Sequence, residues 1–174
     1  KVIKNSNSKL NVLITLHRRE NFIFYFTEIL ESLKQMMEKF NDINFKFVIH
    51  ANPMVKKLIL KLSLERFKNL NFIEPLEYQD FLNLMKQQTL LLTDSGGIQE
   101  ECVSLKIPTI VFRENTERVE GLKFNFIKLS KPSKKKLLND FKNMILGIKN
   151  NEMRFPSRNP YGDGRALPSP YGFL

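Results

Sequence analysis

The 174-residue sequence contains a single cysteine, Cys102, and no apolar run long enough to span a bilayer. One cysteine excludes an intrachain disulfide and is typical of a reducing compartment, so we expect a cytoplasmic protein with no membrane contact and no signal peptide. Cys102 has no evident general base beside it. We therefore expect it to be a small buried core residue and not a nucleophile.

The sequence also lacks internal repeats and low-complexity linkers. Hydrophobic residues make up 42% of it and aromatic residues 11%, which excludes a disordered chain. This length predicts one domain with a full core. We place that domain at residues 1–166, followed by an irregular tail at 167–174, where two prolines disfavour a helix.

Acidic residues are fewer than basic ones, and the net charge is +10. Such a charge is compatible with binding to nucleic acid or to an anionic surface. However, the lysines are scattered, and the only run, at residues 134–136, lies in a segment with the apolar spacing of an amphipathic helix. We therefore interpret the run as a solvated helix face and expect no nucleic-acid partner.

Apolar strand-like runs alternate with segments of helical spacing along the chain. Strict alternation predicts parallel strands joined by right-handed crossovers, and continuous apolar runs predict a sheet covered on both faces. The expected fold is a doubly wound, Rossmann-like α/β domain. Its predicted strands are at 11–16, 43–49, 69–73, 89–93, 108–112 and 124–129, and its helices at 22–40, 54–65, 78–87, 97–106 and 133–149.

The most informative motif lies at residues 93–101, between a predicted strand and a predicted helix. Gly96 and Gly97 allow a backbone to approach a ligand closely, and the free N–H groups of a helix start attract phosphate. Ser95 can cap the helix or touch an anion, and Glu101 can accept hydrogen bonds from ribose hydroxyls. The same residues could form only a tight turn with an N-cap. The motif favours a nucleotide diphosphate site once a second cluster is considered.

That second cluster, residues 17–21, begins with His17 at the end of the first predicted strand. In the common doubly wound order 3-2-1-4-5-6, strands 1 and 4 are neighbours at the topological switch point. Ligands bind there, outside the carboxyl ends of the strands. The order therefore predicts that His17 and the glycine motif flank one crevice around a bound anion.

Several segments of the chain resemble the non-hydrolysing UDP-N-acetylglucosamine 2-epimerases. The similarity extends from about residue 10 to residue 166, in the order and spacing of that family. The segments that carry it are His17-Arg18-Arg19-Glu20-Asn21, His50-Ala51-Asn52-Pro53, Asp94-Ser95-Gly96-Gly97-Ile98-Gln99-Glu100-Glu101, Arg113 with Thr116-Glu117-Arg118, and Asn159-Pro160-Tyr161-Gly162-Asp163-Gly164.

The resemblance implies an isomerase that interconverts UDP-N-acetylglucosamine and UDP-N-acetylmannosamine, for cell-envelope polysaccharide. It implies elimination of UDP to a glycal and re-addition from the other face, with no metal and no cofactor. The family fold resembles the two-domain GT-B type, and this chain resembles only the C-terminal, UDP-binding half. The N-terminal domain, which carries the family's acid–base carboxylates, is absent from this sequence. We expect little or no activity from this chain alone.

Residue roles follow from the resemblance by position. Ser95, Gly96 and Gly97 would hold the diphosphate, and Glu101 the ribose hydroxyls. Arg118 would stabilise phosphate charge. A surface ion pair between this arginine and the neighbouring acidic residues, Glu117 or Glu120, is the alternative.

The remaining roles also rest on the resemblance. Phe81 would lie beside the uracil, although its helix position alone would suggest a core residue. His17 would face the β-phosphate and stabilise the departing UDP, unless it only satisfies a strand end. Arg18 and His50 would lie near a second, allosteric nucleotide-sugar site, although His50 could simply order the turn that follows it.

Two other functions stay open from the sequence. One is the donor-nucleotide domain of a GT-B glycosyltransferase, which would use the same ribose-binding acid. The other is a non-catalytic module that binds nucleotide sugars. Whether the domain forms a homodimer, and whether a hydrolysing relative is the better functional match, is also open.

Overall fold

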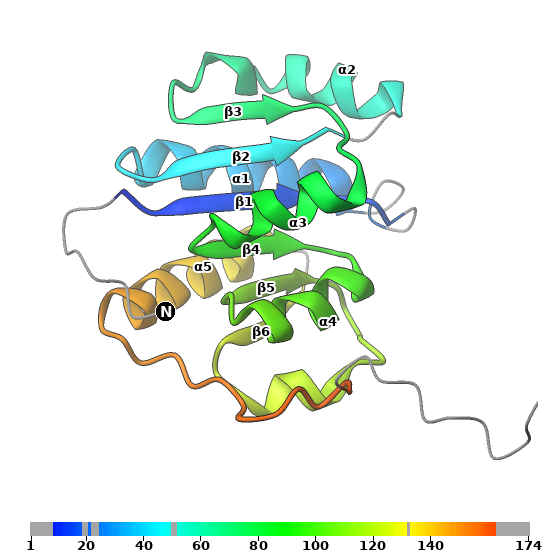
Figure 1. Cartoon of the computed structure of the whole chain (residues 1–174). Helices are drawn as coiled ribbons and strands as arrows, with labels where there is room; N and C mark the ends of the chain where they lie inside the picture. Colours follow the sequence, from blue (N-terminus) through cyan, green and yellow to red (C-terminus); the bar gives the residue numbers. More distant parts are fainter. Residues whose placement is uncertain (1–8, 19–20, 22–24, 50–51, 132, 163–174) are drawn as a thin grey trace, which may run out of the picture.

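The computed structural model describes residues 9–18, 21, 25–49, 52–131 and 133–162. One sheet of six parallel strands has the order β3-β2-β1-β4-β5-β6, as predicted (Figure 1). The strands are β1 (Asn11–Thr15), β2 (Asn44–Val48), β3 (Leu70–Ile73), β4 (Leu90–Thr93), β5 (Thr109–Phe112) and β6 (Ile127–Ser130).

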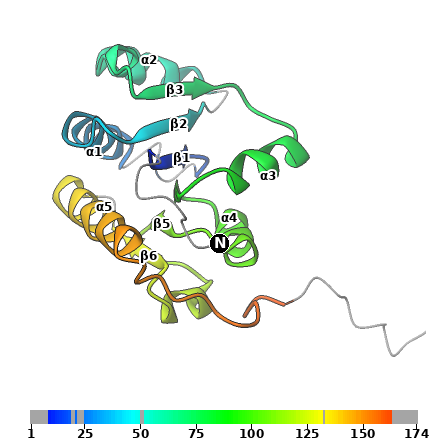
Figure 2. The same cartoon turned by 60° about the vertical axis from the view of Figure 1, so that its left-hand side comes forward.

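Helices cover both faces of this sheet, which confirms the doubly wound, Rossmann-like fold (Figure 2). On one face lie α1 (Phe26–Lys39), α2 (Pro53–Lys61) and α5 (Lys134–Lys149), and on the other lie α3 (Tyr78–Lys86) and α4 (Gly96–Leu105). Two short 3-10 helices, η2 (Leu64–Arg66) and η3 (Val119–Lys123), complete the described elements. In this part of the chain, no helix has the length and apolar character needed to cross a membrane.

Successive residues of β1 point to opposite faces of the sheet, and both faces are buried. Val12 and Ile14 pack in the cluster beneath α1, α2 and α5, whereas Leu13 packs in the cluster beneath α3 and α4. In β4, Leu91 likewise packs on the side opposite to its two leucine neighbours. Side chains alternate between the two faces of a sheet along each strand. A strand whose two faces are both covered by helices therefore has no polar face. This explains the continuous apolar runs in the sequence.

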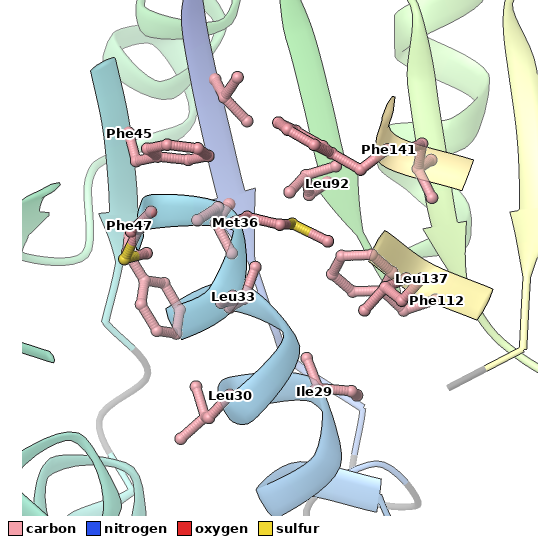
Figure 3. Close-up of a cluster of buried hydrophobic side chains, with 14 of the residues drawn as sticks. Ile29, Leu30, Leu33, Met36, Phe45, Phe47, Leu92, Phe112, Leu137 and Phe141 are labelled. Carbon is pink, nitrogen blue, oxygen red and sulfur yellow. The ribbon is translucent and has the colours of Figure 1, made fainter. Parts of the chain in front are cut away.

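The larger core cluster joins α1, α5 and the sheet (Figure 3). Phe141 of α5 lies with its ring centroid 6.0 Å from that of Phe45 and 5.1 Å from that of Phe40. Buried aromatic rings contribute large apolar areas, and offset or edge-on pairs add further attraction. The lysine run at 134–136 is exposed on α5, while Leu137 is buried, so this helix is amphipathic as predicted.

Two predicted boundaries are wrong. The predicted helix 54–65 ends at Lys61, because Ser63 has a φ of 52°, in the left-handed region. The predicted strand 124–129 begins only at Ile127, because the residues before it form turns. The N–H of Phe124 donates a hydrogen bond to the carbonyl of Gly121, and the N–H of Ile127 donates one to the carbonyl of Phe124. Asn125 anchors that turn to the chain after α5. The expected tail at 167–174 lies outside the described residues.

We predict that Leu33→Ala destabilises the domain by about 2–5 kcal/mol, because it leaves a cavity in the core that the neighbours fill only in part. Leu33 is fully buried in α1, whereas Leu60 of α2 is 63% exposed. Leu60→Ala is therefore the matched control and is expected to change stability by less than about 0.5 kcal/mol. Urea unfolding measures both variants, and equal effects would contradict the assignment of the core.

Candidate functional site

The predicted crevice lies where β1 and β4 end side by side. Thr15 pairs with Thr93 in the strand register, and their side-chain oxygens are 2.7 Å apart. The chain continues from these threonines into His17 on one strand and Ser95 on the other. Both residues line the same cleft. The switch point therefore brings together two clusters that are almost eighty residues apart in sequence.

Asp94 is the buried link between these two strand ends. Its side chain has no solvent exposure. One carboxylate oxygen accepts a hydrogen bond from the main-chain N–H of His17 at 2.8 Å, and the other accepts from that of Arg18 at 3.0 Å. Hydrogen bonds to a charged group are stronger than those between neutral groups. Asp94 therefore fixes the backbone on which the histidine stands.

Asn21 extends this link to a third strand. Its amide nitrogen donates to Asp94 at 2.8 Å and to the carbonyl of Phe112, at the end of β5, at 3.2 Å. The sequence analysis gave neither Asp94 nor Asn21 a role of its own. The available signal was their position, because polar residues directly after buried strands must find partners when the tertiary structure buries them.

The cleft has a volume of about 320 Å³ and two chemically different parts. Its apolar part comes from α3, from the loop before it and from the end of β2, while His17 and Ser95 supply polar groups. Such a site suits a ligand that combines a flat apolar group with an anion. The lining residues are His17, Val48, Pro75, Leu76, Tyr78, Phe81, Ser95 and Ile98. Phe81 therefore lies in the cleft.

The start of α4 has the geometry of an anion site. Ser95 is the N-cap, and its hydroxyl accepts a hydrogen bond from the N–H of Ile98 at 3.4 Å. A Cβ built on the exposed Gly97 would come no closer than 3.9 Å to any protein atom outside its neighbours, so this side is open to the exterior. The first N–H groups and the helix dipole there favour negative charge.

Gly96 also leaves room for an arginine side chain. A Cβ on this buried glycine would lie 2.9 Å from Nη1 and 3.0 Å from Cζ of Arg118. Its missing side chain therefore leaves room for the Arg118 guanidinium, which lies against the first residue of α4. Positive charge from a side chain thus adds to the positive end of the helix dipole.

Arg118 is held by acidic residues at this position. It forms ion pairs with Glu100 of α4 and, at 3.5 Å, with Glu117. Of the two surface partners expected, Glu117 is confirmed, and Glu100 is a partner that the sequence analysis did not propose. Arg113 binds both carboxylate oxygens of Glu117 at 3.2 Å. These hydrogen bonds are the main cause of the lowered pKa of Glu117, and the charge of Arg18 adds a smaller effect.

Glu101 lies one residue further along α4, beside the wall formed by α3. A hydrogen bond with Glu101 raises the pKa of the exposed Tyr78, which lines the cleft. The carboxylate therefore lies near a residue of the cleft wall. Of the two residues expected near an allosteric site, Arg18 is at the same edge of the sheet, while His50 lies outside the described residues.

Cys102 is buried in the second core cluster, as expected. Burial raises the pKa of its thiol to about 12, which keeps the thiol protonated at neutral pH. A protonated buried thiol is a poor nucleophile. Cys102 is therefore a core residue and not a candidate nucleophile.

Comparison with known proteins identifies the family. The family model described as UDP-N-acetylglucosamine 2-epimerase matches residues 1–169. The chain belongs to this family. A UDP-N-acetylglucosamine 2-epimerase of Campylobacter jejuni is 40% identical over 162 residues, which cover 93% of this chain and 42% of the relative. The chain thus spans less than half the length of the curated epimerases that it matches.

Solved epimerase structures have the same fold. The UDP-N-acetylglucosamine 2-epimerase of Neisseria meningitidis bound to UDP-GlcNAc has a TM-score of 0.79 and 35% identity, covering 88% of this chain and 41% of its own. The Methanocaldococcus jannaschii epimerase in complex with UDP-GlcNAc and UDP has a TM-score of 0.73 and 35% identity, covering 91% of this chain and 44% of its own. The expected family and fold are confirmed.

We predict that Asp94→Asn lowers the free energy of unfolding of this epimerase domain by about 1–3 kcal/mol. The amide turns an N–H₂ group toward one of the two main-chain donors and leaves that donor unsatisfied. Asp42, 64% exposed in a 3.8 Å ion pair with Lys149, provides the control. Asp42→Asn is expected to cost less than about 0.5 kcal/mol in the same urea titration. Equal stability of the two variants would show that Asp94 does not hold the strand ends.

Proposed function

We propose that this chain is the UDP-binding half of an enzyme that interconverts UDP-N-acetylglucosamine and UDP-N-acetylmannosamine. The observation that carries this proposal is the shared cleft: His17, Ser95 and Phe81 line it, beside the positive start of α4. The N. meningitidis and M. jannaschii relatives, which bind UDP-GlcNAc, support the choice of ligand.

The nucleoside part of UDP fits the apolar end of the cleft. We assign the uracil to the surface beside Phe81, where the ring can pack flat against apolar groups. We assign the ribose hydroxyls to Glu101, whose carboxylate lies near Tyr78 of the cleft wall. A carboxylate can accept two hydroxyl hydrogen bonds, so neighbouring ribose hydroxyls can both donate to it.

The diphosphate fits the start of α4. We assign it to the Ser95 hydroxyl and to the N–H groups of Gly96 and Gly97, which begin the helix. The Arg118 guanidinium lies against the same helix start and would stabilise phosphate charge. These groups are fixed before the reaction, so they can stabilise charge that develops on UDP without reorganising.

The reaction that we propose is elimination and re-addition of UDP. Cleavage of the bond between sugar C1 and the β-phosphate oxygen leaves the electron pair on UDP, while C2 loses a proton and a C1–C2 double bond forms. A proton then adds to the opposite face of C2, and UDP adds back to C1. His17, fixed through Asp94, would donate a proton or a hydrogen bond to the departing phosphate oxygen.

The groups that move the C2 proton would come from the part of the curated relatives that this chain does not span. We therefore propose that the chain alone binds UDP but does not epimerise the sugar. Arg18 and His50 are assigned to a second, regulatory nucleotide-sugar site. The position of Arg18 supports this assignment, because its main chain is fixed at the same strand edge by Asp94.

We predict that the isolated chain binds UDP more tightly than ADP in calorimetry. Glu101→Ala should weaken UDP binding about 10- to 100-fold, because it removes charged hydrogen bonds to the ribose, and Ser95→Ala about 3- to 10-fold. Glu65→Ala is the control, because Glu65 lies on η2, before β3, at the opposite end of the sheet. Equal affinity for UDP and ADP in a folded chain would overturn the uridine assignment.

We predict that a chimaera of the N-terminal part of the C. jejuni relative and this chain epimerises UDP-N-acetylglucosamine. In deuterated water, elimination and re-addition should place deuterium at C2 of the sugar. The His17→Ala chimaera should still bind UDP but turn over about 100- to 10,000-fold more slowly, the usual contribution of a general acid. A folded chimaera that binds UDP, but instead transfers the sugar to an acceptor without C2 exchange, would identify a glycosyltransferase.

A further inference from the structure

The segment after α5 returns across the molecule to the loop that carries Arg118. In Figure 1 this orange segment runs past η3, and its contacts agree with that path. The Tyr161 hydroxyl donates a hydrogen bond to the carbonyl of Arg118 at 2.9 Å and accepts one from the N–H of Gly121 at 3.0 Å. The Tyr161 hydroxyl is thus hydrogen-bonded to the main chain of this loop at two positions, Arg118 and Gly121.

Gln99 of α4 contacts the same carbonyl. Its side chain has no solvent exposure, and its amide nitrogen donates to the Arg118 carbonyl at 2.7 Å. The Gln99 amide oxygen accepts from the Thr116 hydroxyl at 2.9 Å, and that hydroxyl accepts from the N–H of Arg118 at 3.2 Å. Both main-chain polar groups of Arg118 are therefore fixed by side chains.

Gly121 is required by the approach of the tyrosine. A Cβ at this position would lie 2.6 Å from the Tyr161 hydroxyl oxygen, closer than real contacts allow. Burial is the largest cause of the raised pKa of Tyr161. The hydroxyl therefore stays protonated near neutral pH and can donate its hydrogen bond to the Arg118 carbonyl.

Tyr161 is itself anchored to α4. Asn159 accepts a hydrogen bond from the Tyr161 N–H at 3.0 Å and donates one to the hydroxyl of Ser104 at 2.7 Å. Gln99 and Ser104 both belong to α4, the helix whose first residues form the anion site. The hydrogen bonds that hold the Arg118 main chain therefore connect it to α4, the helix against whose start the Arg118 guanidinium lies.

We propose that Tyr161 is a positioning residue for the phosphate end of the site. Its hydroxyl, with the Gln99 amide, fixes the main chain of Arg118 and so holds the guanidinium over Gly96 at the start of α4. This inference rests on the proposed binding of UDP. It adds the segment around Tyr161, more than forty residues beyond Arg118, to the groups that determine how tightly the diphosphate is held.

A purely structural role for Tyr161 makes a different prediction. Loss of packing or stability would weaken binding of every ligand that uses the cleft, including uridine, which has no phosphate. Loss of positioning would weaken only ligands that Arg118 contacts. The comparison of UDP with uridine therefore separates the two roles.

The test is Tyr161→Phe, which keeps the ring and removes the hydroxyl. We expect UDP affinity to fall about 3- to 10-fold in calorimetry, the usual effect of one hydrogen bond. Uridine affinity, measured by NMR titration, should stay within about 1.5-fold. In an Arg118→Ala background the same change should have no further effect on UDP, because coupled residues are not additive.

Tyr25→Phe is the matched control. It removes a tyrosine hydroxyl that binds Glu114 at 3.1 Å on the exposed surface, and UDP affinity should not change. An equal loss for UDP and uridine in Tyr161→Phe, or a full effect in the Arg118→Ala background, overturns the positioning role. Wild-type affinity in Tyr161→Phe, with Arg118→Ala still weakened, overturns it while leaving the proposed function intact. A wild-type chain that prefers UDP no more than ADP overturns the proposed function and this inference with it.

Discussion

The buried carboxylate of Asp94 is the contact on which the geometry of the site depends. It receives main-chain hydrogen bonds from His17 and Arg18 and a side-chain hydrogen bond from Asn21, which also reaches the end of β5. A buried charge without such partners would be strongly destabilising, so the three donors and the carboxylate require one another. The main chain at His17 and Arg18 is therefore held in place by a residue at the end of β4.

The start of α4 is the second reference point. Ser95 caps it, Gly96 leaves space for the Arg118 guanidinium, and Gly97 is open to the outside. The two glycines of one motif thus have different surroundings, because Gly96 is buried against Arg118 and Gly97 is exposed. The guanidinium against this helix start is paired with Glu100 and Glu117, so the proposed diphosphate would share it with those two carboxylates.

The cleft has an apolar wall and a polar wall, which suit different parts of a ligand. The apolar wall from α3 and its preceding loop suits a base, and the polar groups at the ends of β1 and β4 suit phosphate. Both belong to one domain, although the chain spans only about 42% of a curated relative. In the proposed function the sugar would lie beyond the diphosphate and would be contacted by a second domain.

The sequence determined the fold class and the position of the site. Continuous apolar strands, alternating with amphipathic helices, fix a sheet that is covered twice, and the switch point then follows from the strand order. His17, Ser95 and Phe81 could be placed on this basis and from the family resemblance. The contacts of Arg118 with Glu100, Gln99 and Tyr161 could not, because they join separate elements that lie up to 43 residues apart in the sequence. Local spacing determines which face of an element is apolar, but only the packed tertiary structure decides which buried polar groups meet, since each must find a partner in three dimensions.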